Sequence, residues 1–230
     1  MKDEILSYWE MCSRQGMALQ RGMYFRTPPA HGVILMSRRP NAPYQDSMSI
    51  DESVLEYEGH DAKKSTYLLD PKTVDQPRFE TNGKPTQNGE FANWVDKVNS
   101  AQASPANFRV YEKIRPGIWT DRGLFTLVDY MLVYSERRSV FRFKLEQAPF
   151  DSSGSTESEG HDLPTSRQIP SWIKQEVYKR DKGHCVLCGS QDNLHFDHDF
   201  PHSKGGTSVL PANVRILCAR HNLAKSAKIE

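Results

Sequence analysis

The sequence has no apolar run close to the roughly 20 residues that a membrane-spanning helix needs. Its first ten residues, MKDEILSYWE, mix charged and aromatic side chains and lack the apolar core of a signal peptide. There is no internal repeat, and the net charge of +1 shows no excess of one sign. These absences argue against a membrane or secreted protein, and we expect a cytoplasmic location.

Cysteine is also scarce, with four residues in the whole chain. Cys12 stands alone, whereas Cys185, Cys188 and Cys218 all lie in the C-terminal part. In a cytosolic protein, such clustering indicates metal binding rather than disulfide bonds.

Charge and composition change near residue 150. Residues 1–150 carry 20 Lys/Arg and 19 Asp/Glu, residues 151–165 carry no Lys/Arg and 4 Asp/Glu, and residues 166–230 carry 10 and 6. The segment 151–159, DSSGSTESE, has no apolar residue and cannot contribute to a core. We therefore expect an N-terminal domain over 1–150, a flexible acidic linker over 151–165 and a basic C-terminal domain over 166–230. The alternative is a long surface loop within one domain.

The predicted fold class is α+β. Runs of aromatic and β-branched residues predict strands over 32–36, 53–57, 108–114, 124–133 and 140–145, which would form a curved sheet or barrel. Helices are predicted over 3–15 and 91–98. In the C-terminal domain, a helix capped by Ser171 is expected to run to Arg180, followed by a strand over 194–196 and a helix from about Ala219.

Two short motifs in the C-terminal domain have the spacing of a zinc site. Cys185-Val-Leu-Cys188 and Cys218-Ala-Arg-His221 each separate two ligand-type residues by two others. Together they offer the four sulfur and nitrogen ligands that structural zinc prefers. A domain of about 65 residues has a small core, so a bound metal would stabilise it.

Between these motifs, the segment from Leu194 to Gly206 reads LHFDHDFPHSKGG, and Asn213-Val-Arg-Ile-Leu follows before Cys218. From about Arg167 to Lys225, the order of these residues resembles the HNH nuclease family, whose ββα-metal module hydrolyses phosphodiester bonds. The resemblance implies a zinc-containing ββα-metal fold and a DNA endonuclease activity.

The resemblance also implies roles for particular residues. His198 would be the general base, Asp197 a ligand of a catalytic Mg²⁺ or Mn²⁺, and Asn213 the residue that orients the His198 imidazole or its loop. Asn222 stands where the family has its last catalytic-metal ligand, which leaves His221 for zinc; in the alternative register the two exchange roles. These types suit the chemistry, because neutral imidazole accepts protons near pH 7 and oxygen ligands suit hard cations. Possible phosphate contacts are Lys204, Arg220 and Lys225, each of which could equally be an ordinary solvated charge.

The N-terminal domain has a second set of motifs. A strand ending in Ser37 precedes Tyr44-Gln-Asp46, and then Tyr57-Glu58-Gly59. With the later Arg109-Val-Tyr strand, this order resembles the SRA domain, which binds modified cytosine flipped out of the duplex. The resemblance implies a modified-base pocket formed by Tyr44, Asp46, Tyr57 and Glu58. Glu58 stands where that family has Thr, and Ala42-Pro43 replaces its double Gly. Aromatic faces and a carboxylate acceptor suit a flipped cytosine, although each residue could instead be part of the sheet core or a turn.

Together the two resemblances predict a modification-dependent restriction endonuclease. Its partner would be double-stranded DNA containing 5-methyl- or 5-hydroxymethylcytosine, and it would act as a homodimer. A restriction endonuclease for an unmodified sequence, or a non-catalytic zinc-containing DNA-binding protein, are the alternatives.

Overall fold

The structure is a computed structural model that describes residues 4–135, 137–148, 169–201 and 206–225. The expected linker, residues 151–165, therefore lies outside the described residues. No helix among the described residues is long and apolar enough to cross a membrane.

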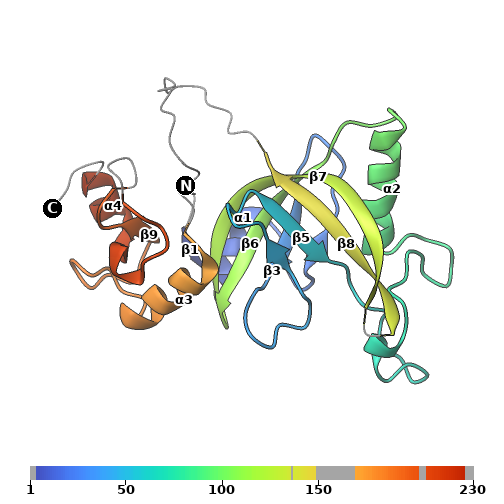
Figure 1. The fold of residues 1–230 in the computed structure, drawn as a ribbon, viewed down its shortest axis with the longest axis horizontal. Helices are drawn as coiled ribbons and strands as arrows, with labels where there is room; N and C mark the ends of the chain where they lie inside the picture. Colours follow the sequence, from blue (N-terminus) through green and yellow to red (C-terminus); the bar gives the residue numbers. More distant parts are fainter. Residues whose placement is uncertain (1–3, 136, 149–168, 202–205, 226–230) are drawn as a thin grey trace.

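The N-terminal part, residues 4–148, is built on one strongly curved, mostly antiparallel sheet (Figure 1). The strand order is β2-β3-β6-β7-β8-β5-β4, and β1 pairs with β7. Of these pairs only β3 and β6 are parallel. A register shift between Leu127 and Asp129 interrupts the pairing of β7 with β8, and such bulges bend and twist a sheet. The strands are β1 Ile5–Ser7, β2 Met23–Tyr24, β3 Gly32–Met36, β4 Ser47–Met48, β5 Val54–Glu58, β6 Asn107–Arg115, β7 Ile118–Ser135 and β8 Arg138–Gln147.

The five strands predicted from the sequence are confirmed as β3, β5, β6, β7 and β8. Helix α2, Gln87–Asn99, includes the predicted helical segment 91–98 and packs its apolar face on the sheet. Phe91 of α2 contacts the rings of Phe108 and Phe143, with centroids 4.5 and 5.3 Å apart. This aromatic cluster forms the centre of the largest core.

The predicted helix over residues 3–15 is partly wrong. Residues 5–7 form β1, and helix α1 spans only Tyr8–Gln15. Ser7 caps this helix: its hydroxyl accepts from the Glu10 N–H, and the Glu10 carboxylate accepts from the Ser7 N–H. This reciprocal capping box fixes where the helix begins, so the residues before it are free to pair with β7.

The C-terminal module, residues 169–225, begins with α3, Ser171–Arg180. Strands β9, Leu194–His198, and β10, Val214–Cys218, then form an antiparallel pair, and α4, Ala219–Lys225, follows β10 directly. A short 3-10 helix, η3, Pro211–Asn213, precedes β10, and another, η1, Pro71–Thr73, lies in the N-terminal part. The strand expected over 194–196 and the helix expected from about Ala219 are present as β9 and α4, whereas β10 was expected only from the resemblance to the ββα-metal module.

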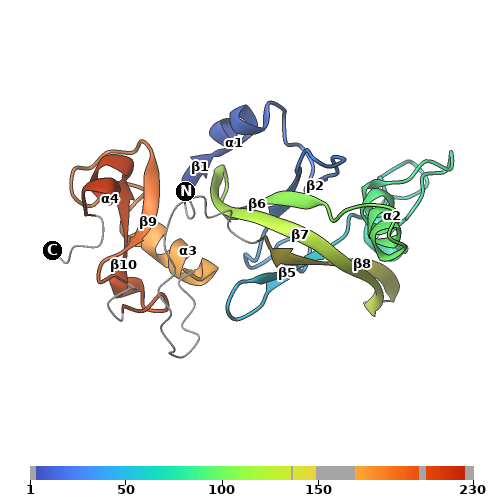
Figure 2. The same ribbon diagram turned by 90° about the horizontal axis from the view of Figure 1, so that it is seen from above.

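The module has its own apolar core, to which Ile5 of β1 also contributes. Both views place β1 and α3 where the C-terminal module meets the large sheet, with α2 at the far end of that sheet (Figures 1 and 2). Ser171 is the first residue of α3 and not its cap, since Pro170 holds the cap position without a side-chain hydrogen bond.

Candidate functional site

The four predicted zinc ligands lie together in the C-terminal module. One ligand atom from each of Cys185, Cys188, Cys218 and His221 falls in a group whose members are all within 4.8 Å of one another. His221 Nδ1 is 3.4 Å from Cys185 Sγ and 3.3 Å from Cys218 Sγ, and Cys188 Sγ is 3.9 Å from Cys218 Sγ. Bonds of about 2.0–2.3 Å to a tetrahedral ion place ligand atoms at about such separations. The group could therefore hold a metal ion such as zinc.

Local structure explains this convergence. A turn closed by the Gly189 N–H and the Cys185 carbonyl brings the first two thiols together. Cys218 ends β10, and His221 lies in the first turn of α4. Burial by itself raises the pKa of the Cys185 thiol, but backbone N–H groups and His221 outweigh it and lower that pKa to about 6. A thiolate at neutral pH is the form that binds metal.

Asp197 and His198 lie at the end of β9, and a lysine of α4 reaches them. Lys225 Nζ is 2.6 Å from Asp197 Oδ2 and also donates to the His198 carbonyl. His198 Nε2 is 2.8 Å from the hydroxyl of the buried Ser208. Lys225 therefore fixes the Asp197 carboxylate and Ser208 fixes the His198 imidazole, both at the end of β9.

Asn213 acts on the loop that follows β9. Its Oδ1 accepts from the Phe200 N–H at 2.8 Å, and its Nδ2 donates to the Thr207 carbonyl at 2.8 Å. Among the described contacts, Asn213 therefore links Phe200 and Thr207, at the two ends of this loop. Asn222 lies three residues before Lys225, hence on the same face of α4.

The three residues expected to contact phosphate differ in where the structure places them. Lys204 lies outside the described residues, and Arg220 is exposed. Lys225 differs from its expected role, because its side chain is 2% exposed and its ammonium is directed at Asp197 rather than at solvent. His195, which flanks the motif, is buried on β9, and its backbone is paired with that of Leu217 in β10.

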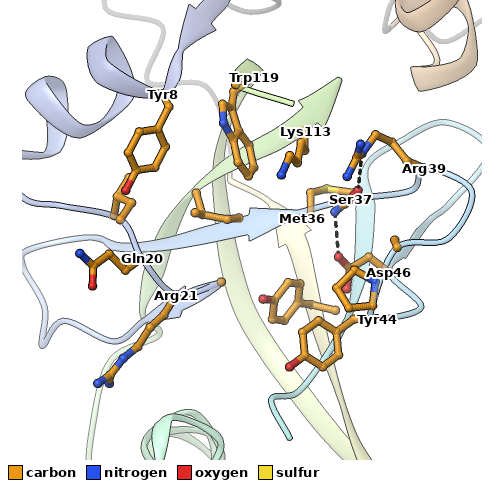
Figure 3. A pocket seen from close by; sticks show the side chains of 17 residues that line it. Tyr8, Gln20, Arg21, Met36, Ser37, Arg39, Tyr44, Asp46, Lys113 and Trp119 are labelled. Atoms are coloured by element: carbon orange, nitrogen blue, oxygen red, sulfur yellow. Dashed lines mark hydrogen bonds between the residues drawn. The ribbon is translucent and has the colours of Figure 1, made fainter. Parts of the chain in front are cut away.

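A cavity of about 440 Å³ opens in the N-terminal part (Figure 3). Asp46 lies at one end of it, where Asp46 Oδ2 accepts from the Ser37 N–H at 2.9 Å and Oδ1 from the Glu58 N–H at 3.2 Å. Burial raises the pKa of Asp46 to about 7, although these N–H groups oppose the change. Arg39 donates to the Ser37 hydroxyl on the same wall.

The two expected tyrosines also line this cavity. Tyr57 is fully buried on β5, and its hydroxyl is 3.2 Å from His60 Nε2. The Tyr44 ring stacks on His60, with centroids 5.5 Å apart and an interplanar angle of 17°. Burial lowers the pKa of His60 to about 4, so its ring is neutral near pH 7.

The expected pocket position of Glu58 is corrected by the structure. Successive side chains of a strand point to opposite faces of a sheet, so Glu58 points away from the face that Tyr57 occupies. It lines a second, smaller cavity of about 240 Å³ and forms ion pairs with Arg138 at 3.6 Å and Arg142 at 3.4 Å. Its carboxylate also accepts from the Gln45 N–H and does not line the main cavity.

Several residues of the main cavity have no signal in the sequence. Tyr8 of α1, Lys113 of β6 and Trp119 of β7 form the end of the cavity away from Asp46 (Figure 3). Lys113 and Trp119 face each other across the β6–β7 hairpin, Tyr8 is about 100 positions earlier, and the three belong to no common motif. The sequence also did not indicate Ser208, the partner of His198, because no spacing rule relates it to the histidine.

Comparison with known proteins gives structural likenesses alone, since no protein-family model and no curated protein matches the sequence. The SRA domain of SUVH5 in complex with hemimethylated CG DNA is 22% identical, with 70% of this chain and 93% of that chain covered and a TM-score of 0.43. A structure described as the modification-dependent TagI restriction endonuclease is 17% identical, covering 97% of this chain and 76% of that chain, with a TM-score of 0.41. KRYPTONITE in complex with mCHG DNA is 14% identical over 68% of this chain and 34% of that chain, with a TM-score of 0.41. At these identities the function of the chain has to be argued from its own residues.

Proposed function

We propose that this chain is a modification-dependent DNA endonuclease, in which the N-terminal part binds a flipped modified cytosine and the C-terminal module cuts the duplex as an HNH nuclease. The observation that carries the proposal is the β9–β10–α4 unit, which has Asp197 and His198 at the end of β9 and a Cys3His group beside it. Its order and residue types match those of the ββα-metal nucleases that the sequence resembles.

The main cavity suits the flipped base. Extruding a base costs a few kcal/mol, which a pocket offsets by stacking and by hydrogen bonds to the Watson–Crick edge. Asp46 can accept from the N4 amino group of cytosine, and Tyr44 and Tyr57 supply aromatic surface beside it. We expect 5-methyl- or 5-hydroxymethylcytosine to be the bound base.

His198 would remove the proton from the attacking water. Ser208 contacts Nε2 of the ring and so orients the imidazole for this role. Water oxygen would form the new bond to phosphorus as the bond to the leaving deoxyribose oxygen breaks. Asp197 and Asn222 offer a carboxylate and an amide oxygen, which suit Mg²⁺ or Mn²⁺. Such an ion, when bound, supplies positive charge to the phosphate.

The test is cleavage of matched plasmids that differ only in cytosine modification, with Mg²⁺ or Mn²⁺. Modified DNA should be cut faster by several-fold at least, since one buried methyl group contributes about 0.8 kcal/mol. His198→Ala should reduce cleavage at least about 100-fold while binding is retained. Equal cleavage of both plasmids would favour a restriction enzyme for an unmodified sequence. Wild-type activity of the variant would refute the assigned base.

A non-catalytic DNA-binding protein is the second candidate, and the contact between Lys225 and Asp197 favours it. The Lys225 ammonium lies where a cation bound to Asp197 would have to approach. Lys225→Met separates the two candidates. If the lysine only orients Asp197, the variant retains metal-dependent nicking. If neither the wild type nor Lys225→Met nicks DNA with Mg²⁺ or with Mn²⁺, while both still bind modified DNA, the chain is a DNA-binding protein without nuclease activity.

A further inference from the structure

A layer of buried charge lies between the large sheet and the C-terminal module. Arg38 Nη2 is 2.8 Å from Glu52 Oε1, and Arg38 Nε is 3.1 Å from Glu112 Oε1. Arg122 also pairs with Glu52, and its Nε lies 3.7 Å from Glu112 Oε2. Both glutamates and Arg122 are buried. Breaking a buried ion pair is strongly destabilising, because the remaining charge is left buried without a partner.

This layer continues into α3 of the C-terminal module. Arg38 Nη2 donates to the Ser171 hydroxyl at 2.6 Å, and Arg122 Nη1 donates to the Ile169 carbonyl at 3.4 Å. Lys174 of α3 is fully buried. Burial alone would raise the pKa of Glu112, but the charges of Arg122, Arg38 and Lys174 lower it. Charged groups from both parts of the chain therefore share one buried network.

The same contact region includes β1. Ile5 packs in the core of the C-terminal module, and the backbone of Glu4 forms an isolated antiparallel β-bridge with that of His195 in β9. β1 pairs with β7 of the large sheet, so it contacts both parts. The next residue after β1, Tyr8, lines the main cavity, as does Ser37, the neighbour of Arg38. One wall of the cavity is thus one residue away from a contact with the module, at Arg38, and another is three residues away, at Ile5.

We propose that Arg38 is a positioning residue, which fixes the C-terminal module relative to the base cavity and so sets the distance between the modified cytosine and the cut phosphodiester bond. This inference rests on the proposed function. A module held only by a linker would reach many phosphates. A module held by buried ion pairs would reach few, because each movement would expose or separate paired charges.

The test is the distribution of cut positions on an end-labelled duplex that contains a single modified cytosine. Wild-type protein should cut at one dominant distance from that base. In Arg38→Met, the cuts should spread to neighbouring phosphodiesters. Ser171→Ala should shift the distribution in the same direction by less, because it removes only the hydrogen bond of Arg38 across the boundary and leaves the ion pairs of Arg38 intact.

Arg78→Met is the matched control. Arg78 has an ion pair with Asp96 at 2.5 Å and hydrogen bonds to Asn93 and Tyr130, all within the N-terminal part. It should leave the cut position unchanged even if it destabilises the protein. An unchanged, sharp cut position in Arg38→Met and Ser171→Ala would overturn the proposal.

A readout without cleavage distinguishes this failure from failure of the proposed function. Spin labels on unnatural amino acids at two exposed positions, Asn99 of α2 and Lys179 of α3, report the distance between the two parts. The distance distribution should be narrow in the wild type and Arg78→Met, and broader in Arg38→Met. If the wild type cuts no DNA but shows this pattern, the proposed function fails and the positioning role of Arg38 stands; equally narrow distributions in all variants refute the role.

Discussion

Asp46 is the residue whose ionisation has the clearest consequence for binding. With a pKa of about 7, the side chain is mostly protonated at pH 6 and mostly ionised at pH 8. A protonated carboxyl can accept from N4–H of cytosine and donate its own proton to N3, whereas a carboxylate can only accept. We therefore predict that binding of modified DNA weakens as the pH rises above 7, by at most about tenfold per pH unit for a single proton. Equilibrium binding between pH 6 and 9 measures this slope.

Asp46→Asn provides the control for that prediction. The amide keeps one acceptor and one donor for the cytosine edge but does not titrate. Its NH2 group faces one of the two backbone N–H donors, from Ser37 or Glu58, so the variant should bind more weakly at pH 6. Its affinity should nevertheless be nearly independent of pH. A pH slope equal to that of the wild type would show that another group titrates.

At this scale the sequence predicted those residues that belong to compact motifs. Tyr44, Asp46 and Tyr57 line one cavity, as their motifs indicate. Glu58 does not line it, because the side chains of successive strand residues point to opposite faces of the sheet. The contact of Lys225 with Asp197 depends on how α4 packs against β9, which no local pattern determines.

Among the elements, the turn with Cys185 and Cys188 gives the most direct test. Cys188 is exposed, whereas Cys185 is in the core. Cys188→Ser therefore removes one metal ligand with little loss of apolar packing. We predict that the variant loses its zinc and that the β9–β10–α4 unit unfolds, since binding of structural zinc contributes about 10 kcal/mol or more. Elemental analysis measures the metal, and hydrogen exchange of residues 194–218 measures the folding.

Cys12→Ser is the comparison for that experiment, because Cys12 belongs to α1 and packs against a core cluster of the N-terminal part. It should retain about one zinc per chain and normal protection of the C-terminal module. A zinc-free wild type with a fully protected β9–β10 pair would rule out a structural metal. Protection of the large sheet should survive Cys188→Ser, since its core is a separate cluster.

The longer strands of the large sheet could be predicted because their aromatic and β-branched residues form short continuous runs. Residues 3–15 could not, because apolar residues in Ile5-Leu6 and Trp9 fit a helix as well as a strand followed by a helix. The deciding features are the Ser7 cap and the unpaired edge of β7, and the second of these exists only in the folded sheet. Ser171 was expected to cap α3; it instead accepts from Arg38, which lies 133 positions earlier in the chain.

For the whole molecule, the sequence predicted two parts but not how they meet. The composition near residue 150 favours a boundary, whereas the buried layer pairs Arg38 with Glu112, 74 positions away, and Glu52 with Arg122, 70 positions away. A sequence pattern describes single elements well. It does not describe a surface that forms only when several of them pack together.

The number of chains needed to cut a duplex is the last prediction. The described residues contain one Asp197–His198 pair, and such a site acts on one strand at a time. The two strands of DNA are antiparallel, so a second active site related by two-fold symmetry would face the other strand. We predict that nicking of a modified plasmid is first order in protein, whereas its linearisation requires two chains and rises more steeply with concentration.

Mixing with inactive protein tests this prediction directly. His198→Ala retains the base cavity and the contacts of Arg38, so it should still pair with wild-type chains on DNA. An excess of this variant should convert linear product into nicked circles, because most assemblies then contain one active site. Arg78→Met added in the same excess should not, since its active site is intact. If linear product persists unchanged in an excess of His198→Ala, a single chain cuts both strands in turn, and the two-fold arrangement is refuted.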